Sequence, residues 1–209
     1  MMALSFNGTG DFINETVAAV SGYPASCSGW FYPTQNSVAK VAFTVRSTDS
    51  NERLQVTQQS DGSGFKVVVR SGGTFSAEAG QAYSLNTWAH VCAVWESSSL
   101  LKISVNGATF STVNPGATPG ALNETGYQGG RISGAAPTST YQGYACEQGI
   151  WNVVLTQEEC VALSKGMSPK RIRPSSLVRY IRCIRSSKEL KGNANTLTGT
   201  TVVPHPRII

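Results

Sequence analysis

The alternation of apolar and polar residues along this chain predicts a series of short β-strands. Within residues 86–107, "NTWAHVCAVWESSSLLKISVNG", the run 88–95 places apolar side chains on both faces of an extended segment, which indicates a strand buried on both sides. Residues 100–105 then alternate as a strand with one solvent-facing side. Asn106 and Gly107 follow, and both tolerate the positive φ of a tight hairpin turn.

The same alternation recurs at a spacing of roughly ten residues, which is typical of a sandwich of two antiparallel sheets. Strands are expected in "ALSFNGTGDFI", "CSGWFYPT", "VAKVAFTVRST", "RLQVTQQ" and "FKVVVRSGGTFSA", the last two flanking a turn at Asp61-Gly62. Residues 114–143 are rich in Gly, Pro and Thr and predict long loops around one short strand. "YACEQGIWNVVL" then predicts a final buried strand, with Trp151 and Val153 in the core.

One short helix is predicted in "LTQEECVALSKG". Thr156 can act as N-cap, and Glu159 three residues later completes a capping box. Gly166 can take the left-handed position that ends the helix. The chain is therefore expected to be all-β apart from two to three helical turns.

Composition supports one domain without a membrane segment. The 209 residues are 40% hydrophobic and include 21 glycines, which suits a single all-β core. The longest apolar runs are too short to span a bilayer, and "MMALSFNGTGDF" lacks the features of a signal peptide. We therefore expect neither export nor membrane anchoring.

The cysteines are too sparse for a disulfide scaffold and lack the CxxC spacing of zinc or redox sites. They are expected to be buried free thiols, although an intermolecular disulfide stays open because their number is odd. They are Cys27, Cys92, Cys146, Cys160 and Cys183.

Positive charge is concentrated near the C-terminus. Residues 1–164 carry 7 basic and 11 acidic groups, whereas residues 165–209 carry 10 basic groups and one acidic group. Such a segment can be a footprint for nucleic acid or for an acidic protein surface. In "SLVRYIRCIR" the arginines alternate with apolar residues as in a strand, so specific nucleic-acid binding is not expected.

Three motifs, in order, resemble the laminin-G-like members of the concanavalin A-like lectin/glucanase family. "LSFNGTGDFI" resembles the family's opening strand, "NTWAHVCAVWESSSLLKISVNG" its central hairpin, and "ACEQGIWNVVLTQEECVALSKG" its closing strand and helix. The resemblance covers most of residues 3–166 and implies a two-sheet antiparallel jelly-roll sandwich. It says little about function, because this fold serves lectins, hydrolases and structural modules.

The C-terminal segment resembles the family's first strand, so the strand order looks permuted. "SLVRYIRCIRSSKELKGNANTLTGTTVV" matches a strand that usually precedes the first motif, and residues 177–184 are expected to re-enter the sheets beside the N-terminal strand. Residues 1–203 would form a single jelly-roll domain. Residues 204–209 would leave it as an extended arm that docks on a neighbour.

No catalytic set is visible in the sequence, so an enzyme is not expected. Glycosidases of this fold need two carboxylates on one strand, and no E-x-D-x-E motif occurs. His90 is interpreted as a hydrogen-bonded structural histidine, because no triad spacing accompanies it. Asp11 and Asn14 are explained by turn chemistry, so no metal or other cofactor is expected.

Aromatic residues in loops are the candidates for sugar contact. The four tryptophans lie in strand-like runs and are expected in the core. Tyr127, Tyr141 and Tyr144 lie in or near the predicted loops and are the candidate glycan contacts.

The sequence leaves three hypotheses for the function of this protein. The first is a virion structural protein, with a capsid decoration protein preferred over a tail part; stand-alone chains of this permuted type resemble proteins of tailed-phage virions. The second is a glycan-binding lectin or adhesin on a phage tail or fibre, and the third is a hydrolase with an unrecognised site. The first implies other virion proteins as partners, a possible homo-oligomer, and synthesis in the host cytoplasm. The candidate assembly contacts are Lys170, Arg171, Arg173, Arg185, Val202, Val203, Ile208 and Ile209.

Overall fold

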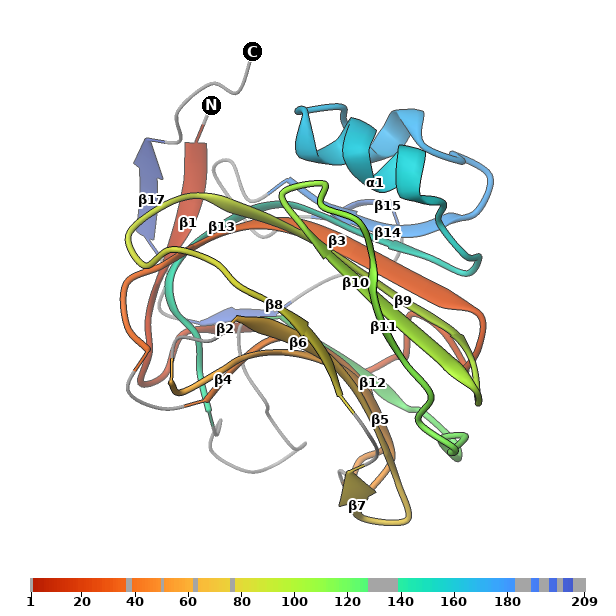
Figure 1. Ribbon diagram of the computed structural model, residues 1–209. Coiled ribbons are helices and arrows are strands. Elements are labelled where there is room, and N and C mark those ends of the chain that lie inside the picture. Colours follow the sequence, from red (N-terminus) through yellow and green to blue (C-terminus); the bar gives the residue numbers. More distant parts are fainter. Residues whose placement is uncertain are drawn as a thin grey trace.

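The computed structural model describes residues 2–36, 39–49, 51–61, 64–75, 78–127, 139–182, 189–191, 196–198 and 201–204. These residues form two antiparallel sheets packed face to face (Figure 1), which confirms the predicted all-β sandwich with one short helix. Among them, no helix is long and apolar enough to cross a membrane.

The first sheet, sheet A, has nine strands in the described part of the chain, and its main path runs β11-β10-β9-β3-β13-β1-β17. Strands β14 and β15 extend it beyond β13. The strands are β1 (Met2–Asn7), β3 (Ala25–Pro33), β9 (Ala89–Ser97), β10 (Leu100–Val105), β11 (Ser111–Val113), β13 (Gln142–Trp151), β14 (Leu177–Ile181), β15 (Glu189–Lys191) and β17 (Thr201–Pro204).

The second sheet, sheet B, has eight described strands in the order β16-β2-β12-β4-β5-β6-β7, with β8 also paired to β6. The strands are β2 (Phe12–Glu15), β4 (Lys40–Arg46), β5 (Arg53–Gln58), β6 (Phe65–Ser71), β7 (Thr74–Phe75), β8 (Ala79–Gln81), β12 (Glu124–Tyr127) and β16 (Thr196–Thr198). The predicted hairpin around Asp61 is confirmed by the antiparallel pairing of β5 with β6.

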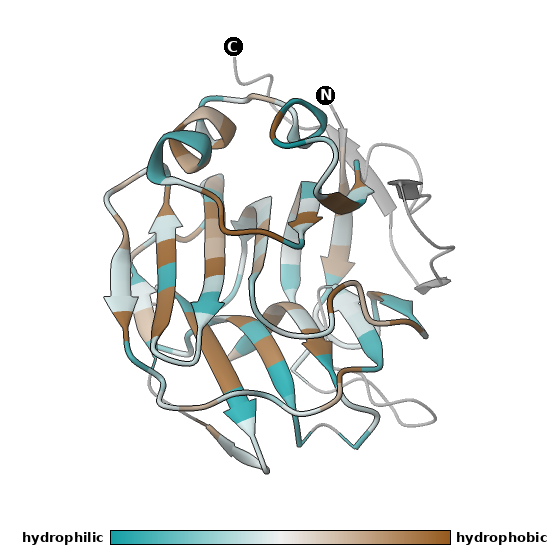
Figure 2. Cartoon of the chain, turned by 90° about the vertical axis from the view of Figure 1, so that its right-hand side faces the viewer, coloured by the Kyte–Doolittle hydropathy of each residue, from teal (hydrophilic) through white to brown (hydrophobic). Residues whose placement is uncertain are grey.

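The core lies between the sheets and follows the alternation of the sequence. Strand β9 turns Ala89, Val91, Ala93 and Trp95 toward sheet B, while Cys92 and Val94 join a second apolar cluster on the opposite face of sheet A. Figure 2 shows the alternation of hydrophobic and hydrophilic residues along the strands of both sheets. The prediction that this strand is buried on both faces is confirmed.

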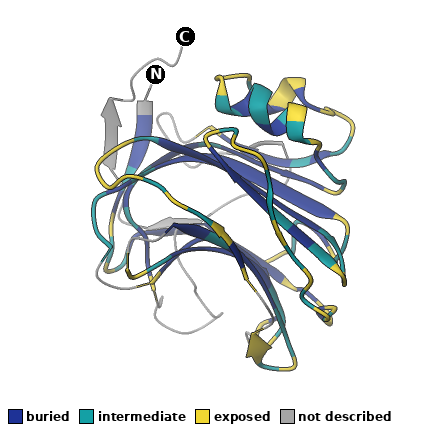
Figure 3. Cartoon of the chain, in the orientation of Figure 1, coloured by how far each residue is buried: buried dark blue, intermediate teal, exposed yellow. Residues whose placement is uncertain are grey.

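Helix α1 (Gln157–Ser164) and the 3-10 turn η1 (Pro169–Arg171) cover the second cluster (Figures 1 and 3). The predicted capping box is present, since Thr156 accepts from the Glu159 amide and Glu159 accepts from the Thr156 amide. Gly166 has the predicted positive φ, 89°. We name residues 157–173 the helical cap.

A disulfide between Cys92 of β9 and Cys160 of α1 ties the helical cap to sheet A. The prediction that these two residues are free thiols is therefore wrong. It failed because the pairing depends on α1 folding back over β9, across 68 residues of sequence. Cys27 is a buried free thiol as predicted, and Cys146 is buried as predicted and lies outside this disulfide. Cys183 lies outside the described residues.

Asn106 and Gly107 have the predicted positive φ, 55° and 76°. The connection from β10 to β11 is nevertheless longer than a tight turn, because β11 begins only at Ser111. The Asn106 side chain instead accepts a hydrogen bond from the His90 amide, 2.9 Å away. The Asn-Gly pair therefore fixes the start of β9 as well as reversing the chain.

The C-terminal strands extend both sheets, with β16 paired to β2 in sheet B, but those in sheet A are not all in the predicted position. β14 pairs with β13 rather than with the N-terminal strand, along the length of β13 that β1 leaves open. The strand beside β1 is β17, with Val203 opposite Ala3 and Val202 opposite Leu4. Of the predicted C-terminal arm, Pro204 belongs to β17, and residues 205–209 lie outside the described residues.

Candidate functional site

The candidate site lies on the face of sheet A that points away from sheet B. Side chains two residues apart share a face of a strand, so Trp30 and Tyr32 of β3 both point outward. Trp30 lies opposite His90 of β9, and Tyr32 lies opposite Tyr144 of β13. Three adjacent strands thereby place aromatic residues in two neighbouring rows.

Three of these rings form a cluster that we name the aromatic platform: Tyr32, Trp88 and Tyr144. The Tyr32 ring centroid lies 5.5 Å from that of Trp88 and 5.3 Å from that of Tyr144. All three side chains are half-buried, so part of each ring faces solvent. Half-exposed aromatic side chains combine an apolar surface with a polar edge, which suits contact with a ligand that has both.

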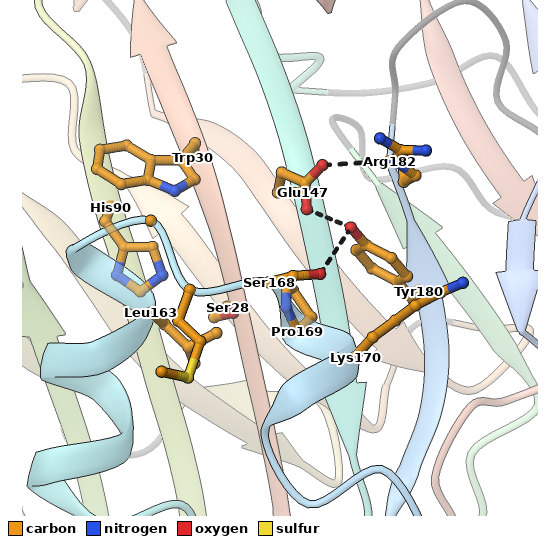
Figure 4. Close-up of a pocket in the computed structure, with 12 residues that line it drawn as sticks. Ser28, Trp30, His90, Glu147, Leu163, Ser168, Pro169, Lys170, Tyr180 and Arg182 are labelled. Atoms are coloured by element: carbon orange, nitrogen blue, oxygen red, sulfur yellow. Dashed lines mark hydrogen bonds and ion pairs between the residues drawn. The ribbon is translucent and has the colours of Figure 1, made fainter. Parts of the chain in front are cut away.

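Beside the platform, a pocket of about 190 Å³ lies between the helical cap and sheet A. We name it the outer-face pocket. In Figure 4, Trp30 and His90 lie on one side, and Glu147, Ser168, Tyr180 and Arg182 lie on the other. The remaining lining residues are Ser28, Leu163, Gly166, Met167, Pro169 and Lys170.

Glu147 supplies the carboxylate of the pocket. It lies in a bulge of β13 between Cys146 and Gly149, and its φ of 51° is unusual for a residue other than glycine. The Tyr180 hydroxyl donates a hydrogen bond to it, and Arg182 Nε lies 3.8 Å from its Oε1. Burial raises the pKa of the Glu147 carboxyl, while the contacts with Tyr180 and Arg182 partly lower it.

His90 is a deeply buried polar group of the pocket, with 2% of its surface exposed. Its ring meets the Trp30 ring edge to face at 5.2 Å. Burial lowers the pKa of His90 to about 3, so the imidazole is neutral at ordinary pH. Nδ1 is fully buried and has no hydrogen-bond partner in the described structure. At this nitrogen, the ring lacks the hydrogen bond predicted for a structural histidine.

The acidic groups of the pocket limit the chemistry that its described lining residues supply. Glu147 is the only carboxylate among its lining residues, whereas most glycosidases need two. In the described part of the chain, no three His, Cys, Asp or Glu side chains are grouped so that they could hold a metal ion.

Of the three predicted glycan contacts, the structure leaves one at the surface. The prediction that Tyr127 and Tyr141 are surface residues is wrong, because both are fully buried between the sheets. Tyr127 belongs to the short strand β12, and its hydroxyl donates to Glu15 at 3.1 Å. Tyr144 belongs to the aromatic platform and remains a candidate.

The predicted assembly contacts divide into described and undescribed residues. Lys170, Arg171 and Arg173 are exposed on the helical cap. Val202 and Val203 form part of β17, and only their backbone pairing is described. Arg185, Ile208 and Ile209 lie outside the described residues.

The cationic segment has more acidic partners than the sequence suggested. Arg173 pairs with Glu159 at 2.6 Å, Arg182 with Glu147 at 3.8 Å, and Arg179 with Glu15 at 2.7 Å. These three arginines therefore have acidic partners within the chain. The sequence around them did not indicate this, because the fold brings Glu15 and Glu147 from distant strands.

Several residues of the site were not singled out from the sequence. Trp95 and Trp151 are fully buried as predicted, but Trp30 borders the pocket and Trp88 is half-buried on the platform. Their alternation with core residues gave no sign of this, because the outward face of sheet A is itself mostly covered. Glu147 carried a weak signal, since it is an acid followed closely by glycine inside an apolar strand.

The fold and this site define a lectin-like β-sandwich. Residues 7–160 match the profile of the concanavalin A-like lectin/glucanases superfamily, and the chain belongs to that family. A search of curated protein sequences returned no match.

Solved structures agree with this fold at low sequence identity. A native heptameric SAP-like pentraxin from Limulus polyphemus has a TM-score of 0.67 at 15% identity, over 96% of this chain and 94% of the pentraxin. A candidate carbohydrate-binding protein from Bacteroides ovatus has a TM-score of 0.71 at 15% identity, over 97% of this chain and 59% of that one. Domain 4 of the arabinanase AbnA from Geobacillus stearothermophilus, solved with arabinotriose, has a TM-score of 0.63 at 18% identity, over 78% and 76%.

Proposed function

We propose that this protein is a non-enzymatic glycan-binding protein whose site is the aromatic platform together with the outer-face pocket. The observation that carries the proposal is the continuity of the two parts along β3, where Tyr32 of the platform and Trp30 of the pocket are two residues apart. A sugar chain lying along this strand meets aromatic rings first and polar groups next.

Each part matches one property of a sugar. The apolar face of a pyranose ring packs on aromatic rings such as Tyr32 and Tyr144, and its hydroxyls need hydrogen-bond donors and acceptors. Glu147, Ser168 and Lys170 supply these at the pocket wall. The neutral His90 ring adds an aromatic surface beside Trp30.

The comparisons support a binding role in general terms. One similar structure is a candidate carbohydrate-binding protein, and another is an arabinanase domain in complex with arabinotriose. At sequence identities of 15–18%, these similarities show a shared fold and do not by themselves show a shared ligand. The single carboxylate of the pocket supports binding without hydrolysis.

The test is a glycan array, followed by calorimetric titration of the best ligand. Tyr32→Ala and Tyr144→Ala should each weaken binding about tenfold, because a stacked ring contributes on the order of 1 kcal/mol. The control is Val17→Ala, which removes an exposed apolar side chain outside the aromatic platform and the outer-face pocket. The proposal is contradicted if no glycan binds saturably, or if all three variants lose the same amount of affinity.

A second pair of variants tests the pocket. Arg182→Gln should weaken binding a few-fold, since its guanidinium is half-exposed beside Glu147. Arg171→Gln removes the same charge from an exposed position outside the pocket and should leave binding unchanged.

We further propose that the setting is a virion, in which this protein is a capsid decoration protein; the alternative is an adhesin on a tail or fibre. The observation that favours an assembly role is a shallow hollow on the outside of the helical cap. It combines the exposed charges of Lys165 and Arg171 with the exposed side chain of Met167. Charges at such a rim steer association, while the apolar side chain adds affinity.

Incorporation into particles tests this setting. A chain with Lys165→Ser, Met167→Ser and Arg171→Ser should be incorporated several-fold less at moderate salt than the parent. Lys66→Ser, on sheet B, is the control for loss of a lysine. Equal incorporation of the triple variant and the parent contradicts the assembly role, and it leaves glycan binding to be judged by its own assay.

A further inference from the structure

Sheet B carries a row of basic residues on the face that points away from the core. Across the strands of Figure 1, Arg46 of β4 lies opposite Arg53 of β5, and Arg53 lies opposite Arg70 of β6. Glu124 of β12 precedes this row and Phe75 of β7 follows it. Directly opposed residues project from the same face of a sheet. Because their chain neighbours Val45, Leu54 and Val69 belong to the core, we infer that the row faces outward.

Accessibility changes along the row. Arg46 is buried and pairs with Glu124, Nη2 to Oε2, at 3.5 Å. Arg53 and Arg70 are partly exposed, and their guanidinium carbons lie 5.4 and 5.0 Å from the centroid of the Phe75 ring. Half of the Phe75 side chain is exposed. The accessible end of the row is thus one flat ring beside two guanidinium groups.

Hydrogen bonds fix both guanidinium groups in place. Arg70 Nε donates to the Gly73 carbonyl at 2.6 Å, and Arg53 Nη1 donates to Gln55 Oε1 at 3.1 Å. Gln55 in turn donates to Thr57 at 2.6 Å. The groups are therefore oriented before any ligand arrives, which reduces the entropy lost on binding.

The row is costly for the folded protein. Like charges directly opposite each other across strands are destabilising. Burial, and after it the charges of Arg70 and Arg46, lower the pKa of Arg53 to about 10. The nearby carboxylate of Glu52 accepts from the Gly72 and Gly120 amides, both at 2.7 Å. An anion placed beside Arg53 and Arg70 would add a charge-assisted contact to each guanidinium group.

We propose that Arg53, Arg70 and Phe75 form a second binding site, which takes an acidic sugar. The carboxylate or sulfate of the sugar accepts from the two guanidinium groups, and its ring packs on Phe75.

Other anionic ligands fit this surface less well. An acidic peptide carries its carboxylates on flexible stems and has no flat ring to place on Phe75. A nucleic acid needs a longer cationic track, whereas the row exposes two guanidinium groups and contains Glu124. The nearby Lys66 is paired with Glu78 at 2.8 Å. The site is separate from the outer-face pocket, because it lies on the other sheet.

The test is calorimetric titration with oligogalacturonate and with a sulfated oligosaccharide, which distinguish the two acidic groups. A neutral galacto-oligosaccharide of equal length and polyglutamate are the comparison ligands. At least one acidic sugar should bind saturably, more tightly than either comparison ligand, and less tightly as salt rises. The Arg53→Gln, Arg70→Gln double variant should bind it at least about tenfold more weakly, while a cooperative melting transition establishes that the variant folds. Phe75→Ala should weaken binding several-fold.

Two controls make the result decisive. Lys66→Gln removes one charge from the same face of β6 and should leave binding within about twofold. Arg53→Lys with Arg70→Lys keeps the charge but loses the planar fork, so it should not restore binding. The site is overturned if the double glutamine variant binds as the parent does, if the lysine variant retains full affinity, or if polyglutamate binds equally well. Loss of binding at Tyr32→Ala, with none at Arg53 and Arg70, would assign the acidic sugar to the outer-face pocket instead.

Discussion

At the scale of single residues, the outer-face pocket contains two ionisable groups whose burial has opposite consequences for stability. Burial disfavours the charged form of each group, which lowers the pKa of His90 and raises that of Glu147. The two residues lie on opposite walls of the same pocket (Figure 4). They can therefore be separated by the pH dependence of unfolding.

His90 should destabilise the protein in acid. The pKa of His90 falls from 6.5 to about 3 on folding. Below pH 6.5, His90 is therefore protonated in the unfolded chain while it stays neutral in the folded chain. The stability contributed by His90 is present above pH 6.5 and is lost as pH falls toward 3, at a limiting slope of about 1.4 kcal/mol per pH unit. Urea unfolding of His90→Gln between pH 4 and 7 should show a flatter curve than the parent. Parallel curves would contradict the prediction.

Glu147 should change the pH dependence of the unfolding free energy in the opposite direction. Its pKa in the folded protein lies above the ordinary value of 4.5, so the folded state holds its proton more tightly than the unfolded state. The resulting stability is present below pH 4.5 and is lost as pH rises through the folded pKa. The difference in unfolding free energy between Glu147→Gln and the parent should therefore shift in favour of the variant from pH 4 to pH 7. A difference that shifts the other way would show that the contacts with Tyr180 and Arg182 outweigh burial.

At the scale of elements, the helical cap covers the outer-face pocket and is attached to the rest of the fold by a disulfide, a hydrogen bond and apolar packing. Cys160 joins α1 to β9 through the disulfide with Cys92, and Gln157 accepts from the Phe110 amide at 2.9 Å. Leu163 packs in the cluster beneath the helix. An eight-residue helix is too short to be stable alone. Its position therefore depends on these attachments.

Removal of the disulfide should lower stability and loosen the pocket. For a bridge across 68 residues, the loss of loop-closure entropy corresponds to about 4 kcal/mol. Cys160→Ala should therefore melt at a lower temperature than the parent and bind glycan more weakly. Cys146→Ala removes a buried sulfur outside the bridge and is the control. The prediction is wrong if reductant leaves the melting temperature of the parent unchanged.

At the scale of the whole molecule, the C-terminal strands close the sandwich. β14 pairs with β13, and its Arg179 reaches across to Glu15 of β2, joining the two sheets at 2.7 Å. Glu15 is 1% exposed and also accepts from Tyr127. A buried ion pair adds little net stability, but loss of one partner leaves an uncompensated buried charge.

Truncation after Ser176 should therefore abolish cooperative folding. It removes the partner of β13 at Gln148–Trp151, exposes the cluster around Leu177 and Tyr180, and leaves Glu15 without Arg179. Thermal unfolding followed by circular dichroism should show no cooperative transition. The control chain lacks only residues 205–209 and should melt as the parent does. A truncated chain that keeps the full transition would show that residues 1–176 are a complete domain.

Much of the fold was predictable because it depends on local patterns. Alternation placed the strands, the Thr156 and Glu159 pair placed the helix, and the sequence from Ala89 to Trp95 indicated burial on both faces. Each of these signals acts over a few residues, where strand or helix period and capping chemistry are sufficient. Sequence alone therefore determined the fold class, the order of most elements, and the faces of their strands.

Tertiary structure alone decided the sites and the partners of charged and sulfur-containing side chains. Cys92 with Cys160, Glu15 with Arg179, and Glu147 with Tyr180 are pairs that lie far apart along the chain. Tyr127 and Tyr141 were assigned to the surface because loop composition cannot show which side chains turn inward. The pocket and the arginine row depend on the register between neighbouring strands. Register follows from the packing of the whole sandwich, and a shift of one residue would reverse every outward face.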